Sequence, residues 1–301
     1  MSRIARFFTV VVLLVGVGSG VLATELGVLV VGPKSDFTRI QDAMDSAADG
    51  DTIHVQSGVY VENLLIEKPI HLLGLGNVTL IPADIESPAI CVMQEGSASI
   101  QHLAIGRASV GIQVSGECMV AYCEISSTEI GLKATVWEPG SVAALRCTFR
   151  GTGVGVELLG SGNVYVLESG FSEFGAAVLV GGRVTASVGK CMIESCYEGV
   201  VANHNATTVL LESEIRDCLG TAVRLSRSPY AEPVGELYVI ESLIEGNGKW
   251  AISFGDINGD NCAAPFVPIL GEGNVIRDNS YGVSCPLDIG LPEVFLAAPG
   301  S

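Results

Sequence analysis

One residue pattern recurs along most of this 301-residue chain with a period near 22. In six of eight units an apolar anchor is followed six positions later by a small residue, and the next position is usually apolar. The anchors are Ile105, Ile125, Phe149, Phe171, Ile193, Ile215, Ile244 and Ile276. The spacing drifts where extra residues are inserted, as loops would do between repeats. Such a period predicts stacked repeats in which no single unit can bury its apolar face alone.

Each unit contains short runs in which apolar and polar residues alternate, which is the pattern of a half-buried strand. Apolar residues stand seven and five positions before the anchor, as Val164 and Val166 do before Phe171. The alternation then slips by one residue, which predicts a bend, and a third run follows the small residue. Three short strands close one coil, and coils stack about 4.8 Å apart. We therefore expect an all-β fold, a parallel β-solenoid with three short strands per coil and about ten coils.

The segment 36–48 has helical periodicity instead, with Ser35 or Asp36 at the expected N-cap. The residues that share one helical face are Ile40, Ala43, Met44 and Ala47. A solenoid exposes unpaired strand edges at its ends. We therefore expect this amphipathic helix to cap the first coil.

The N-terminus has the features of an export signal. Residues 1–6 are basic, residues 7–22 are apolar, and small residues precede a cleavage site after Ala23. The apolar run is shorter than the roughly 20 residues of a membrane-spanning helix. We expect a signal peptide over 1–23 and a secreted, periplasmic or cell-surface protein that is not embedded in the membrane. The β-helix domain is expected over 24–290, with an insertion at 255–274 and a C-terminal tail at 291–301.

The formal net charge of the whole chain is −17 at pH 7. Such a surface repels the phosphates of nucleic acids, so we expect no nucleic-acid partner. It favours solubility outside the cell and leaves cation binding open.

Most of the nine cysteines follow the repeat. The slot two residues before the anchor holds Cys123, Cys147, Ser169, Cys191, Ser213 and Ser242, and the slot three residues after it holds Cys196 and Cys218. Cysteine exchanging with serine predicts a stack of small buried side chains rather than disulfides. Cys262 and Cys285 fall outside the register and form the one expected disulfide.

Charged residues also follow the register. The slot three residues before the anchor holds Arg146, Glu168, Lys190, Glu212 and Glu241, and the slot one residue after it holds Arg150, Ser172, Glu194, Arg216, Glu245 and Arg277. Alternating signs on stacked coils predict ion pairs on a solvated face. The alternative is a cleft that binds acidic or neutral sugars through Arg146, Arg150 and Lys190. The candidate catalytic residues of such a cleft are Glu168, Lys190 and Glu212. The two carboxylates are two coils apart, about 9.6 Å, near the upper limit for a glycosidase pair.

The segment Asp256-Ile-Asn258-Gly-Asp260 has oxygen-bearing side chains at alternate positions and a glycine at the turn. This spacing suits Ca²⁺, so Asp256, Asn258 and Asp260 are candidate calcium ligands. The acidic residue of a twelve-residue calcium loop is missing, because Val267 occupies that position. The alternative is a simple turn in the insertion, without a cofactor.

The opening segment 37–76, "FTRIQDAMDSAADGDTIHVQSGVYVENLLIEKPIHLLGLG", and the recurring "CEISSTEIGL", "CMIESCYEGV" and "NVIRDNSYGV" resemble right-handed parallel β-helix proteins of the pectin-lyase-like superfamily. The resemblance covers roughly residues 37–287 and implies a single-stranded right-handed parallel β-helix. It does not imply one activity, because the superfamily includes lyases, hydrolases, esterases and binding proteins.

The catalytic motifs of the superfamily's pectate lyases, polygalacturonases and pectin methylesterases are missing from the sequence. We therefore expect a non-catalytic binding or scaffold module whose partner is a polysaccharide or cell-surface glycan. The alternative is a polysaccharide lyase or glycoside hydrolase. An aromatic platform on an outer face would favour sugar binding, and the available residues, which share no common register, are Tyr122, Trp137, Tyr165 and Trp250.

Overall fold

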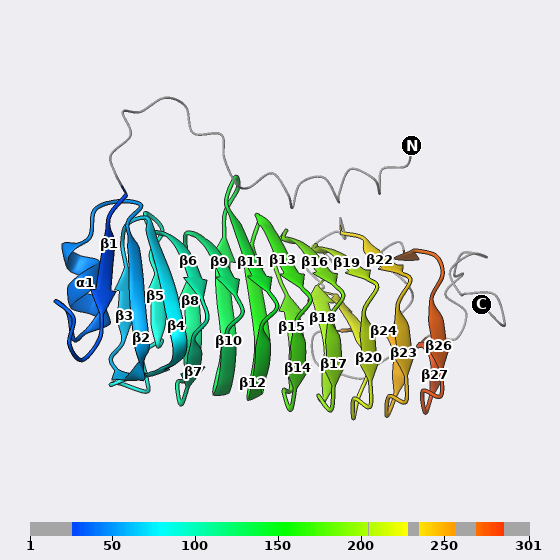
Figure 1. The fold of residues 1–301 in the computed structure, drawn as a ribbon. Coiled ribbons are helices and arrows are strands. Elements are labelled where there is room, and N and C mark those ends of the chain that lie inside the picture. The colour runs from blue at the N-terminus through cyan, green and yellow to red at the C-terminus, as the bar shows by residue number, and fades with distance from the viewer. Residues whose placement is uncertain (1–25, 204, 228–234, 257–268, 286–301) are drawn as a thin grey trace.

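The computed structural model describes residues 26–203, 205–227, 235–256 and 269–285. Over these residues the chain is a parallel β-solenoid of about nine turns with one short helix near its N-terminus. Figure 1 shows the coils stacked side by side, from α1 at one end to β26 and β27 at the other. The number of turns is close to the expected ten. In the described part of the chain, no helix is both long and apolar enough to span a membrane.

Successive coils pair in parallel along three faces. The first face consists of β1 (Val28–Val31), the first parts of β2 (Thr52–Val61) and β4 (Ile70–Ile81), β6 (Ser97–Gln101), β9 (Glu117–Ala121), β11 (Ser141–Leu145), β13 (Asn163–Leu167), β16 (Thr185–Gly189), β19 (Thr207–Leu211), β22 (Leu237–Ile240) and β25 (Ile269–Leu270). The second consists of the last parts of β2 and β4, β7 (Ala104–Gly106), the first parts of β10 (Glu124–Val136) and β12 (Thr148–Gly160), β14 (Gly170–Ser172), β17 (Met192–Glu194), β20 (Glu214–Arg216), β23 (Leu243–Glu245) and β26 (Val275–Arg277). The third consists of β3 (Leu64–Ile66), β5 (Ile90–Val92), β8 (Val110–Val114), the last parts of β10 and β12, β15 (Ala176–Val180), β18 (Glu198–Asn203), β21 (Val223–Arg227), β24 (Trp250–Asp256) and β27 (Gly282–Cys285).

The repeat register is confirmed at every anchor. The eight anchor residues lie opposite one another along the second face, from Ile105 to Ile276. Seven of them are buried and Ile276 is half-buried. Phe149 and Phe171 stack in parallel with ring centroids 4.9 Å apart, which matches the spacing of coils. The anchors therefore form one continuous row of apolar contacts through the interior.

The small residue six positions after the anchor has a steric cause. A Cβ on Gly155 would lie 2.5 Å from the carbonyl oxygen of Ala177 and 2.7 Å from Cδ1 of Phe171. Gly131 has the same surroundings, with the carbonyl oxygen of Gly155 at 2.5 Å and Cδ1 of Phe149 at 2.8 Å. The strand of the third face thus passes close to the anchor ring of the next coil, and the glycine leaves room for that ring.

The expected bend falls three residues before the anchor. The residues there have φ between 45° and 57°, in the left-handed region that non-glycine residues seldom adopt; they are His102, Tyr122, Arg146, Glu168, Lys190, Glu212 and Glu241. We call this series the charged corner row. A second series with positive φ lies two residues after the anchor: Arg107, Glu173, Ser195, Asp217, Gly246 and Asp278. These two bends turn the chain from the first face to the second and from the second face to the third.

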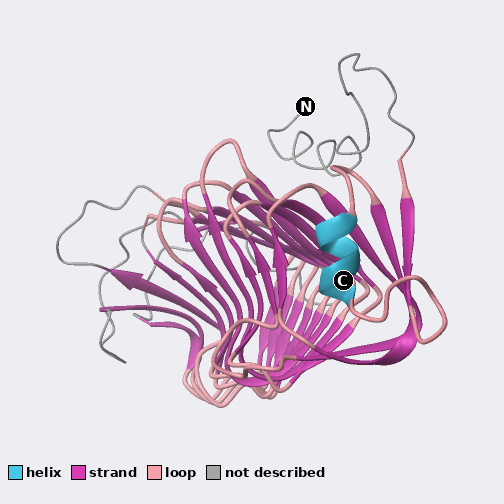
Figure 2. Cartoon of the chain, turned by 90° about the vertical axis from the view of Figure 1, so that its left-hand side faces the viewer, coloured by secondary structure: helices cyan, strands magenta, loops and turns pink. Residues whose placement is uncertain are grey.

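The capping helix is shorter than expected. Helix α1 spans Ile40–Ser46 instead of 36–48, and its N-cap is Arg39 rather than Ser35 or Asp36. The carboxylate of Glu62, which follows β2, accepts hydrogen bonds from the backbone N–H groups of Ile40 (2.8 Å) and Gln41 (3.1 Å). A residue distant in sequence thus satisfies the first free N–H groups of the helix. Figure 2 shows α1 at the end of the solenoid, in front of the stacked coils.

The predicted stack of small side chains at the second-face corners is confirmed. Cys123, Cys147 and Cys191 are buried free thiols, as are Cys196 and Cys218. In other coils the same slots hold serine or asparagine, and these side chains hydrogen-bond to the backbone of a neighbouring coil. The Ser169 hydroxyl accepts from the backbone N–H of Cys147 (3.1 Å), and the Asn247 side-chain oxygen accepts from that of Cys218 (3.0 Å). Small residues that can accept or donate a hydrogen bond therefore fill the interior corners.

These thiols should resist alkylation in the folded protein. Burial raises the pKa of Cys123 and Cys191 to about 12 and that of Cys147 to about 11, so little reactive thiolate exists at pH 8. Cys91 is only half-buried and serves as an internal control. We expect iodoacetamide to label Cys91 first and the three stacked thiols only after unfolding. Mass mapping that finds Cys147 labelled as fast as Cys91 would show that the stack is open.

Candidate functional site

The charged corner row brings the predicted catalytic candidates onto one edge of the solenoid. Oε2 of Glu168 lies 2.6 Å from Nε of Arg146, and Oε2 of Glu212 lies 3.5 Å from Nζ of Lys190. Each carboxylate therefore has its own cation on the preceding coil. The hydrogen bond from Arg146 to Glu168 also raises the pKa of that guanidinium above its usual value.

This arrangement differs from that of an acid–base pair. Lys190 stands on the coil between Glu168 and Glu212, and all three side chains are exposed to solvent. A glycosidase needs two carboxylates whose pKa values are separated by different surroundings. Here both carboxylates face water and both are paired. The charged side chains instead form ion pairs between neighbouring coils, as the sequence predicts.

The slot after the anchor contains further pairs. Arg216 lies 3.2 Å from Glu194, and Arg277 lies 2.7 Å from Glu245. Arg150 instead pairs with a residue at the next bend, because its guanidinium donates two hydrogen bonds to Glu173 (2.8 and 2.6 Å). These bonds hold the pKa of the Glu173 carboxyl below its usual value.

The first part of the charged corner row is aromatic. The rings of His102 and Tyr122 stack with centroids 4.9 Å apart and an angle of 5° between their planes. The guanidinium of Arg146 lies 5.7 Å from the Tyr122 ring centroid and donates to its hydroxyl (3.0 Å). Because these planar groups are stacked, Tyr122 has neighbours on both faces and presents mainly its edge to solvent. This row is therefore a poor platform for stacking a sugar ring.

A second aromatic group lies on the turn between the second and third faces. We define the aromatic corner as Tyr197, Leu219, Lys249, Trp250 and Tyr281. Tyr197, Leu219 and Tyr281 expose 50%, 73% and 57% of their surfaces. Trp250 and Tyr281 meet edge to face at 5.6 Å, and Lys249 Nζ lies 6.0 Å from the Tyr197 ring centroid. Tyr281 is touched only at an edge by Trp250, so its ring keeps a surface open to solvent, which is the property that a stacking platform needs.

The backbone of the aromatic corner is held by hydrogen bonds between coils. Gly220 N–H donates to the carbonyl of Tyr197 (2.6 Å), Lys249 N–H to that of Gly220 (3.0 Å), and Tyr281 N–H to that of Lys249 (3.1 Å). A Cβ on Gly220 or Gly248 would collide with the carbonyl of the preceding coil, at 2.6 and 2.2 Å. The exposed side chains therefore project from a closely stacked and ordered backbone.

Two predicted sites lie outside the residues that the structure describes. Asn258, Asp260 and Cys262 fall within 257–268, and the side chains of Asp256 and Cys285 are not described either. The calcium site and the Cys262–Cys285 disulfide therefore stay predictions, as do the signal peptide and the C-terminal tail. Among the described residues, no group of three or more His, Cys, Asp or Glu side chains is placed to hold a metal ion.

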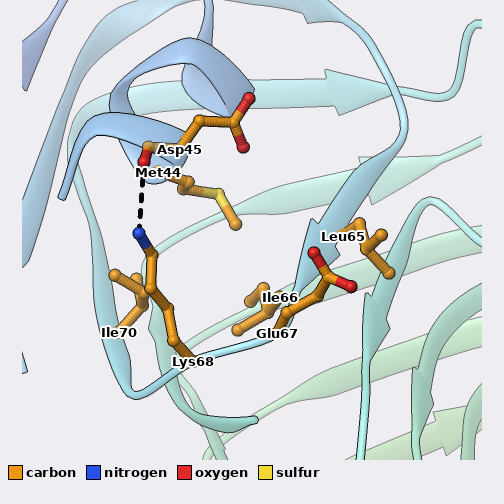
Figure 3. A pocket seen from close by; sticks show the side chains of 7 residues that line it. All are labelled: Met44, Asp45, Leu65, Ile66, Glu67, Lys68 and Ile70. Atoms are coloured by element: carbon orange, nitrogen blue, oxygen red, sulfur yellow. Dashed lines mark hydrogen bonds between the residues drawn. The ribbon is translucent and has the colours of Figure 1, made fainter. Parts of the chain in front are cut away.

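A pocket of about 360 Å³ lies between α1 and the first coil (Figure 3). Its apolar lining comes from Met44, Leu65, Ile66 and Ile70, and its polar lining from Asp45, Glu67 and Lys68. The Lys68 ammonium donates to the main-chain oxygens of Asp45 (3.2 Å) and Ala47 at the end of the helix. Lys68 thus satisfies free carbonyls of the helix C-terminus, and its role here is structural.

Comparisons with known proteins identify the fold. No family model matches the sequence, and no curated protein matches it significantly. Among solved structures, ORF18 of Geobacillus virus E2 superposes with a TM-score of 0.58 at 12% identity, over 85% of this chain and 58% of the viral chain. The pectate lyase Pel9A gives 0.50 at 12% identity, over 86% and 78%, and a pectin methylesterase from carrot gives 0.48 at 14%, over 94% and 91%. The chain therefore shares the parallel β-helix fold of the viral protein and of Pel9A.

Two aromatic residues of the aromatic corner, Tyr197 and Tyr281, are not among the candidates taken from the sequence. Tyr197 stands four residues after its anchor, and Tyr281 stands five residues after its own. Lys249 and Trp250 also fall at different offsets because the turn varies in length. The available signal was an excess of large side chains just after the second bend. Of the four aromatic residues proposed from the sequence, Trp250 belongs to this corner, whereas Tyr122 lies in the charged corner row.

Proposed function

We propose that this protein is an exported β-helix module that binds carbohydrate without turning it over. The observation that carries the proposal is the aromatic corner, where Tyr197 and Tyr281 are exposed and the half-buried Trp250 meets Tyr281 edge to face. Tyrosine and tryptophan contribute large contact areas at a small cost in side-chain entropy, and they dominate many binding surfaces. The pectate lyase that shares the fold acts, by its name, on a polysaccharide, which supports the ligand class.

The absence of turnover is supported by the charged corner row. Glu168 and Glu212 are both ion-paired and exposed, and Lys190 separates them. A lyase or hydrolase of the same fold is the alternative, and it would need an acid–base pair elsewhere. Export is part of the proposal because the protein must leave the cell to meet an extracellular polysaccharide. It rests on the expected signal peptide.

Removing one ring of the aromatic corner should weaken glycan binding. We expect Trp250→Ala to lower the affinity for a bound glycan by about tenfold, because it removes the ring that meets Tyr281 edge to face. The matched control is Trp137→Ala, since Trp137 is also exposed but lies on the turn after β10. A glycan array followed by calorimetry on both variants measures the effect. Equal losses in both variants, or none in Trp250→Ala, would remove the aromatic corner from the binding site.

A further inference from the structure

We infer, resting on the proposed function, that the aromatic corner takes an uncharged glycan chain running parallel to the solenoid axis. The geometry points to this ligand through the order of the side chains along the coils, the stiffness of the turn that bears them, and the charges beside them. Each of these features concerns residues outside the charged corner row.

The order of the side chains defines a path. Tyr197, Leu219, Trp250 and Tyr281 belong to four consecutive coils, whose second-face strands are β17, β20, β23 and β26. Three coil spacings separate the first from the last, a span of about 14 Å. A single sugar could contact only part of this row. A chain of sugars laid along the axis could contact one apolar side chain of the row on each coil.

Hydrogen bonds between coils hold the turn that bears the row. The backbone therefore loses little conformational entropy when a ligand binds. The backbone hydrogen bonds from Gly220, Lys249 and Tyr281 to the preceding coil hold the turns in register. Trp250 also pairs in the third-face ladder, opposite Gly282. Little backbone entropy is lost when such a platform binds a ligand, which favours affinity from stacking alone.

The charges beside the row select against polyanions. Asp217 and Asp278 are exposed at the second bend, a few residues before Leu219 and Tyr281. The neighbouring Arg216 and Arg277 are each paired with a glutamate on the preceding coil, which leaves Lys249 as the cation of the aromatic corner, and the whole chain carries a net charge of −17. A glycan made of uronic acids would be repelled by this field, whereas a neutral chain would not. The two carboxylates can also accept hydrogen bonds from sugar hydroxyls.

Calorimetry with two length series tests the inference on the full-length protein. One series contains neutral oligosaccharides of glucose or xylose, from the monosaccharide to the hexasaccharide, and the other contains oligogalacturonates of the same lengths. We expect affinity for neutral chains to rise with length until the ligand spans the row, and to change little with salt. At low salt the oligogalacturonates should bind at least tenfold more weakly than neutral chains. The double variant Asp217→Asn, Asp278→Asn should reduce the difference in affinity between the neutral chains and the oligogalacturonates. Asparagine tolerates the left-handed backbone at both positions.

Different failures have different meanings. Oligogalacturonates that bind more tightly than neutral chains, with binding lost in Trp250→Ala, would overturn the selectivity while leaving the proposed carbohydrate binding intact. Neutral binding that does not change with length would overturn the axial path. Absence of binding for both series at millimolar concentration would overturn this inference and the proposed function together.

Discussion

Replacing Phe149 by alanine should destabilise the protein by about 3–5 kcal/mol. Phe149 is completely buried, and its ring stacks on Phe171 in the row of anchors. Its removal would leave a cavity between two coils, and the rigid hydrogen-bonded ladders on either side cannot easily collapse into it. Urea unfolding followed by circular dichroism measures the change.

Two controls separate packing from other effects in this experiment. Phe149→Ile should cost clearly less, because isoleucine fills the same slot at Ile125 and Ile193. Met192→Ala, on the solvent side of the same face, should change the free energy of unfolding by less than about 0.5 kcal/mol. A Phe149→Ala variant as stable as Met192→Ala would mean that the anchors do not form the core.

Replacing Gly155 by valine should also be severe, with a cost of about 3 kcal/mol or more. The new Cβ would meet the carbonyl oxygen of Ala177 at 2.5 Å and the ring of Phe171 at 2.7 Å. Neither neighbour can move without breaking the third-face ladder or the row of anchors.

The matched control is Gly170→Val. A Cβ on Gly170 has no atom within 4 Å, and Gly170 also lies in a strand of the solenoid. Valine suits strands, so this variant should be neutral or slightly more stable. Equal melting temperatures for the two variants would contradict the steric explanation of the small residue in the repeat.

The sequence predicted the fold in detail because the repeat determines the contacts. The eight anchors, the bend before each anchor and the cysteine–serine stack all follow from comparing one unit with the next. In a solenoid each residue packs against its counterpart one coil away, so a register read from the sequence is also a contact map. The expectations that concerned these positions were therefore confirmed residue by residue.

The expectations that failed depended on contacts outside the repeat. The sequence around 36–48 could not show that Glu62 caps the helix, because the two segments are distant and Glu62 belongs to no ladder. The aromatic corner was missed because Tyr197 and Tyr281 stand at different offsets from their anchors. Periodicity locates the residues that repeat, and these two exposed rings do not repeat at one offset.

The central claim is that the protein binds a glycan without cleaving it. The most direct test measures binding and product formation with the same polymers. The protein would be incubated with the neutral glycan that it binds best, and with pectate, polygalacturonate and alginate, and each polymer would then be recovered. We predict that binding is detected and lost in Trp250→Ala, while no polymer gains new reducing ends or unsaturated products. Reproducible turnover by the wild-type protein that disappears in Glu168→Gln or Lys190→Ala would contradict this account and establish the chain as an enzyme.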